Sequence, residues 1–65
     1  MTVGEEYPLQ QQRCRELLEI YKSLGPFGSF GHMMISRVLQ RADQAAISGD
    51  LPSMLKSLQE MKGCD

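Results

Sequence analysis

The residues with the clearest capacity for chemistry in this 65-residue chain lie in segment 25–32 and just after it. Three glycines interrupt the helical pattern there, and a predicted helix begins within the segment. Backbone N–H groups at the start of a helix attract phosphates and carboxylates. An anion site at this point would use Gly28, Ser29, His32, Arg37 and Arg41. Binding of an anionic nucleotide is therefore one of two functions that the sequence suggests for this segment.

The spacing of the glycines matches no phosphate-binding motif. A P-loop ends in Gly-Lys-Ser/Thr, which does not follow Gly31. Both the P-loop and the dinucleotide fingerprint also follow a strand, and no strand is predicted before this segment. Arg37 and Arg41 fit a solvated helix face, which is the favoured interpretation of the two arginines.

A catalytic use of these residues is not predicted. His32 is the one histidine and the only candidate for a general base near neutral pH. Ser29 lies three residues before it, but a serine at the start of a helix ordinarily caps that helix. Cys14 falls on the apolar face of a predicted helix, where a thiol is inert. We expect no enzyme, no catalytic residue and no cofactor.

The chain has two cysteines, Cys14 and Cys64. One lies in a predicted helix and the other is next to the last residue. A bridge between them would stabilise a small domain, but a partner so near the chain end makes a weak framework, and two free thiols are favoured. His32 has no Cys or His at ligand spacing, so no metal site is predicted.

The other function of segment 25–32 is contact. The segment holds the only two phenylalanines, Phe27 and Phe30, and Met33 follows them. Phe30, Met33 and the more distant Ile47 all fall outside the main apolar face of their predicted helix. Either the segment folds back so that its aromatic side chains cap the core, or they form an exposed interface. The residues predicted for that interface are Phe27, Phe30, Met33 and Ile47.

Three apolar stripes with helical spacing must position these residues. They predict helices over about 8–24, 30–48 and 51–62. The stripes are Cys14, Leu17, Leu18, Tyr21 and Leu24; Met34, Ile35, Val38, Leu39, Ala42, Ala45 and Ala46; and Leu51, Met54, Leu55, Leu58 and Met61. The sequence therefore predicts an all-α, compact three-helix domain over 8–62, with flexible ends at 1–7 and 63–65.

Turn residues set the ends of the predicted helices. Pro8 suits a first helical turn, and Ser29 suits an N-cap. Gly49 and Asp50 form a short connection, with the glycine ending one helix and the aspartate capping the next. A connection this short predicts an antiparallel hairpin between the second and third helices.

Size and charge narrow the choice of partners. Seven basic and eight acidic residues give a net charge of −1, which lacks the positive bias of nucleic-acid binders. The predicted third helix offers only Lys56 and Lys62 as cations, so a helix-turn-helix DNA-binding regulator is only a third alternative. No apolar run could span a bilayer and no secretory signal is present, so we expect no membrane partner and a cytoplasmic location. Because a domain this small has a marginal core, we expect a homo-oligomer.

Two strings, GPFGSFGHMMI (25–35) and GDLPSMLKSLQEMK (49–62), make the chain similar to short uncharacterised helical proteins of tailed phages and prophages of proteobacteria. The resemblance covers most of the chain from Tyr7 on. It implies a mobile-element accessory protein that binds a host factor, such as a defence component or its nucleotide signal.

The predicted function is a non-enzymatic interaction protein that self-associates and binds a host protein stoichiometrically. The alternative is an oligomeric binder of an anionic nucleotide at the start of the second helix. The third is the DNA-binding regulator.

Overall fold

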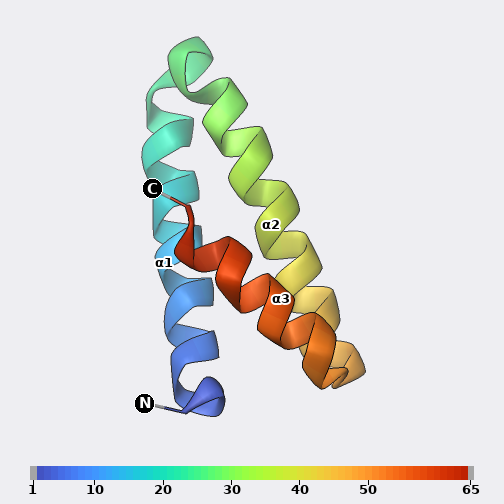
Figure 1. Cartoon of the computed structure of the whole chain (residues 1–65). Helices are drawn as coiled ribbons and strands as arrows, with labels where there is room; N and C mark the ends of the chain where they lie inside the picture. Colours follow the sequence, from blue (N-terminus) through green and yellow to red (C-terminus); the bar gives the residue numbers. More distant parts are fainter. Residues whose placement is uncertain (1, 65) are drawn as a thin grey trace.

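The computed structural model describes residues 2–64 and contains three α-helices and a short 3₁₀ helix (Figure 1). The elements are α1 (Val3–Ser23), η1 (Gly25–Gly28), α2 (Ser29–Ser48) and α3 (Leu51–Lys62). No strand occurs among these residues. α1 and α2 form a long hairpin, and α3 runs back from the end of α2 towards α1. The predicted all-α fold, with the second and third helices packed as a hairpin, is confirmed.

α1 begins five residues before the predicted start at Pro8. Residues 3–7, predicted as part of a flexible segment, are helical instead; Met1 lies outside the described residues. Thr2 is the N-cap, and its hydroxyl accepts a hydrogen bond from the Glu5 N–H at 3.2 Å. The string Thr2-x-x-Glu5 is the signature of a capping box, although no helix start was predicted there.

Tyr7 is the tertiary reason for the early start. Its side chain is buried, and its hydroxyl donates to the Ala42 carbonyl oxygen in α2 at 2.7 Å. Pro8 lies inside the helix and has no N–H to offer to the Gly4 carbonyl. Because Gly4 is exposed, water can satisfy that carbonyl, and the helix continues through the proline.

The connection between α2 and α3 follows the predicted turn chemistry at Gly49 but not at the Asp50 side chain. Gly49 has a φ of +70°, and its N–H donates to the Ala45 carbonyl at 3.0 Å. Asp50 is the N-cap of α3, but its carboxylate accepts from the Ser53 hydroxyl at 2.5 Å rather than from a backbone N–H. The backbone therefore turns sharply at the glycine, and α3 packs directly against α2.

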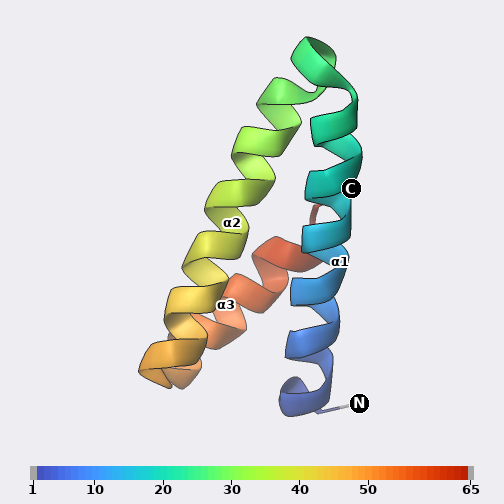
Figure 2. The same ribbon diagram turned by 180° about the vertical axis from the view of Figure 1, so that it is seen from behind.

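The core lies where all three helices meet. Its buried side chains are Tyr7, Cys14, Ile35, Val38, Leu39, Ala42, Leu58 and Met61. α3 has 12 residues, against 21 in α1 and 20 in α2, so it crosses only the halves of α1 and α2 that lie far from η1 (Figures 1 and 2). Leu24 and Met34, both predicted for the apolar stripes, lie beyond its reach and are exposed. Three further stripe residues are exposed although they lie in α3 or at the end of α2 beside it: Ala46, Leu51 and Leu55.

The predicted flexible tail is packed in its described part. Cys64 is half-buried against the core, and its N–H donates to the Met61 carbonyl at 3.1 Å. Arg13 of α1 donates to the Cys64 carbonyl at 2.7 Å. Gly63 and Cys64 therefore continue the end of α3 onto α1, whereas Asp65 lies outside the described residues.

Candidate functional site

The segment between α1 and α2 is a tight helical turn and not an open loop. Gly25 enters it with a φ of +63°, a left-handed conformation that favours glycine. Residues 25–28 then form η1, and α2 follows without a break. The Ser29 N–H and hydroxyl both donate to the Pro26 carbonyl, the hydroxyl at 3.0 Å. Ser29 is thus the first residue of α2, and its hydrogen bonds stabilise η1. It is not the predicted N-cap, because Gly28 holds that position.

Two glycines bring α2 against the end of α1. A Cβ on Gly28 would lie 2.2 Å from the Tyr21 carbonyl oxygen, closer than any real contact. A Cβ on Gly31 would lie 2.7 Å from the Tyr21 ring. The two helices converge at this point in both views (Figures 1 and 2). Backbone and the Tyr21 ring fill the space between them, so no inward position is left for the neighbouring phenylalanines.

Both phenylalanines of the turn consequently face solvent. Phe27 is 96% exposed and Phe30 is 69% exposed. Met33 is exposed as well. The sequence left open whether these side chains cap the core, and the structure answers that they do not.

Two residues that were predicted for the apolar stripes are exposed beside them. Leu24, at the end of α1, and Met34, in the second turn of α2, are about half exposed. We call Leu24, Phe27, Phe30, Met33 and Met34 together the apolar end. Phe30 and Met34 are four residues apart on one face of α2. Leu24 directly precedes η1, and Phe27 lies within it. None of the five carries a charge.

Ile47 does not belong to the apolar end, although it was predicted for the same interface. It is 81% exposed, but it lies in the last turn of α2, beside the connection to α3. Fourteen residues of helix separate it from Met33, which is about 20 Å along the axis. The structure therefore divides the predicted interface into a cluster near η1 and a single distant side chain.

The residues predicted for an anion site are also divided. Ser29 and His32 line one shallow depression, together with Lys22 and Glu19 of α1. Gly28 is buried beneath the turn. Arg37 and Arg41 lie further along α2 outside this depression, and Arg41 forms an ion pair with Glu60 of α3 at 2.6 Å. The five residues do not converge on one point.

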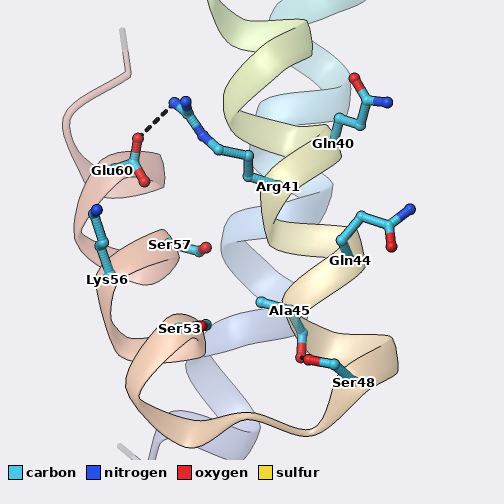
Figure 3. A pocket seen from close by; sticks show the side chains of 9 residues that line it. All are labelled: Gln40, Arg41, Gln44, Ala45, Ser48, Ser53, Lys56, Ser57 and Glu60. Atoms are coloured by element: carbon cyan, nitrogen blue, oxygen red, sulfur yellow. Dashed lines mark hydrogen bonds and ion pairs between the residues drawn. The ribbon is translucent and has the colours of Figure 1, made fainter.

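A groove of about 650 Å³ between α2 and α3 was not predicted from the sequence (Figure 3). Hydroxyl, amide and charged side chains line it, including Ser57, which is buried, and Lys56. Its formation depends on the register of two helices, for which the sequence pattern holds no signal.

Partners within the protein already occupy much of the polar lining of this groove. Arg41 is held by Glu60, and the Ser48 hydroxyl donates to the Ala45 carbonyl at 3.0 Å. Gln40 and Gln44 point away from α3 (Figure 3). The groove thus contains charges of both signs, and its polar groups do not converge on one point where a ligand could bind.

One buried polar contact lies behind the groove. The Tyr7 hydroxyl bonds Ala42 and also interacts with the Ser57 hydroxyl. Burial raises the pKa of Tyr7 above its ordinary 10.0, and the nearby Asp43 carboxylate adds to this, while the Ser57 hydrogen bond opposes it. This tyrosine therefore stays protonated at neutral pH and serves to join α1 to α2.

Comparison of the chain with protein-family models, with curated proteins and with solved structures found no match. Among residues 2–64, no three His, Cys, Asp or Glu side chains come together in a way that could hold a metal ion. In the same part of the chain, no helix combines the length and the hydropathy needed to cross a membrane. The phage resemblance stays a prediction.

Proposed function

We propose that this chain is a non-enzymatic interaction protein that self-associates through the apolar end, with a second copy of the chain as the partner. The observation that carries the proposal is the exposure of Phe27 and Phe30 on a turn that glycine contacts hold against α1. Exposed aromatic and methionine side chains gathered in one place are typical of protein interfaces.

Contacts within the turn hold the exposed phenylalanines in place. A phenylalanine on a flexible loop would lose conformational entropy on binding, which weakens association. Here Gly25, Pro26 and the Ser29 hydrogen bonds fix the path of η1 before any partner arrives. Burying one phenylalanine contributes about 1.5–3 kcal/mol. In a two-fold symmetric dimer each side chain counts twice.

The chemistry of the apolar end suits a copy of itself. Its five defining side chains are uncharged, so two copies can meet without placing like charges against one another. The core of the single chain is small, and α3 leaves the η1 half of the hairpin uncovered. A second copy would cover that half. In the mobile-element setting that the phage resemblance implies, such an assembly would act by stoichiometric binding.

The test is the mass of the particle in solution between about 1 and 500 μM, measured by sedimentation equilibrium or light scattering. We expect the unmodified chain to form dimers. The double variant Phe27→Ala, Phe30→Ala should weaken dimerisation at least a hundredfold, about 2.7 kcal/mol, with unchanged helical content.

Ile47→Ala is the matched control, because it removes an equally exposed apolar side chain at the other end of α2. It should leave the dimer intact. A chain that is monomeric over the whole concentration range would overturn the proposal and favour a different protein as the partner. Equal weakening by Ile47→Ala would also contradict it.

A further inference from the structure

The two cysteines of the chain, fifty residues apart in sequence, lie beside one another in the fold. Cys14 is completely buried in the core, on the face of α1 that α3 contacts. Cys64 follows the last residues of α3 and packs, half-buried, against the same core cluster. Both thiols are free.

One carbonyl group links the positions of the two residues. The Met61 carbonyl oxygen accepts from the Cys64 N–H at 3.1 Å, and the Cys14 sulfur lies 4.0 Å from the same oxygen. The Cys64 N–H and the Cys14 sulfur thus meet at one oxygen, and the two cysteine side chains lie within hydrogen-bonding reach of each other. A disulfide needs Cα atoms about 4.4–6.8 Å apart, which residues placed around a shared carbonyl can reach.

Charged side chains of α1 hold the end of α3 in this place. The Arg13 guanidinium donates to the Met61 carbonyl and to the Cys64 carbonyl. Lys62, the residue after Met61 and the last of α3, forms an ion pair with Glu6 of α1 at 2.7 Å. The approach of Cys64 to Cys14 therefore does not depend on a freely moving tail.

The two thiols differ in how readily they react with an oxidant. Burial, above all, raises the pKa of Cys14 above its ordinary 9.0, and the neighbouring Cys64 thiol adds to the shift. Since the thiolate is the attacking form, Cys14 is a poor first nucleophile. Cys64 is partly exposed, and its thiol donates to the Glu60 carbonyl at 3.5 Å.

We propose that Cys14 and Cys64 form an intramolecular redox pair whose disulfide fixes the end of α3 to α1. With a low-molecular-mass disulfide such as oxidised glutathione, the Cys64 thiolate attacks one sulfur and releases one glutathione thiolate. The Cys14 thiolate then attacks the Cys64 sulfur of the mixed disulfide and releases the second glutathione. The two cysteine protons end on the two glutathiones, and the protein loses two electrons.

The disulfide closes a loop that spans most of the chain, so it constrains the unfolded state strongly. The reduced form relies on noncovalent contacts, among them those of Arg13, Lys62 and Arg41 and the packing of the core, to keep α3 on the hairpin. Oxidation should therefore raise the unfolding temperature by roughly 10 °C or more.

The experiment equilibrates the full chain in glutathione buffers of increasing oxidising power. Intact mass spectrometry and thermal unfolding are then measured on the same samples. The expected product is a monomeric chain lighter by the mass of two hydrogen atoms, with no alkylatable thiol and a raised unfolding temperature. Glutathione adducts alone, or chains linked to one another through sulfur, would overturn the proposal.

Cys64→Ser is the informative variant, because the residue is partly exposed and its replacement leaves the core intact. It should keep the fold and lose both the mass change and the thermal shift. Cys14→Ala serves as a second variant that removes the other sulfur. If either variant still shows the rise in unfolding temperature under oxidising buffer, the rise does not come from this disulfide and the proposal fails.

Discussion

The two ends of the α1–α2 hairpin are packed in opposite ways. At η1 the two helices converge. Gly28 packs against the Tyr21 carbonyl and Gly31 packs against the Tyr21 ring, with no third element between them. At the other end the helices diverge, and α3 fills the gap with Leu58 and Met61, while Tyr7 joins α1 to α2 there. We call this second region the closed end.

The difference shows how the length of α3 decides which part of the hairpin is covered and which part stays exposed. Twelve residues of α3 can cover only about 18 Å of a hairpin whose helices run about 30 Å. The core cluster lies where α3 packs on the hairpin, whereas the apolar end keeps two phenylalanines in water. The buried core therefore belongs to the closed end, and the apolar end is the surface that we propose for binding.

Truncating the closed end should have the largest effect on folding. Met61 is completely buried, and Met61→Ala removes its contacts and leaves a cavity, for an expected loss of about 2–5 kcal/mol in the free energy of unfolding. Urea denaturation measures this. Ile47→Ala, at an exposed site, should change the same quantity by no more than about 0.5 kcal/mol. Comparable losses in the two variants would contradict the proposed division of the molecule.

The glycine contact at η1 is the next test. Gly28→Ala would place a Cβ 2.2 Å from the Tyr21 carbonyl oxygen, so the helices must separate, at an expected cost of about 1–3 kcal/mol. Gly63→Ala is the control, because its Cβ would make only ordinary contacts, the nearest at 3.5 Å. Thermal unfolding of both variants compares them. If Gly28→Ala proves as harmless as Gly63→Ala, the helices do not meet as closely as described.

Tyr7→Phe tests the polar contact at the closed end. It removes the hydrogen bond to the Ala42 carbonyl and should cost about 1 kcal/mol at neutral pH. Chemical denaturation at pH 7 measures that cost.

The same variant has a pH signature. Because the pKa of Tyr7 is raised in the folded state, its contribution is complete below pH 10 and is lost as pH rises through the folded value. Cys14, whose pKa is raised from 9.0, adds a decline that begins at lower pH and that Tyr7→Phe should retain. Unfolding measured from pH 8 to 11 should therefore show a steeper loss in the unmodified chain than in the variant. Parallel curves would mean that Tyr7 is not shielded from water.

The smallest effect is expected for the ion pair that spans α2 and α3. Arg41→Gln breaks the contact with Glu60, but both side chains are partly exposed, so the loss should stay below about 1 kcal/mol and shrink in high salt. Unfolding in 50 mM and 500 mM salt tests this. A loss that persists in high salt would show that Arg41 contributes by packing across the groove and not by charge.

The sequence by itself determined the helices and most of their ends. Stripes such as Ile35, Val38, Leu39 and Ala42 repeat with helical period, and Gly49 permits the left-handed turn that ends α2. These signals are local, because side-chain spacing and backbone freedom depend on neighbouring residues alone. The Thr2-x-x-Glu5 cap is an equally local signal. Pro8 led to the later predicted start, because prolines more often begin a helix than lie within one.

Only the tertiary structure decided which parts of each stripe are buried. Leu24 and Met34 have the same spacing as residues of the core, yet they are exposed because α3 ends before it reaches them. The outward position of Phe27 depends on the contact of Gly28 with Tyr21, and the meeting of Cys14 with Cys64 depends on where α3 ends. Each of these is a distance between segments remote in sequence. Such distances follow from how three helices of unequal length pack, and no local pattern along the chain records them.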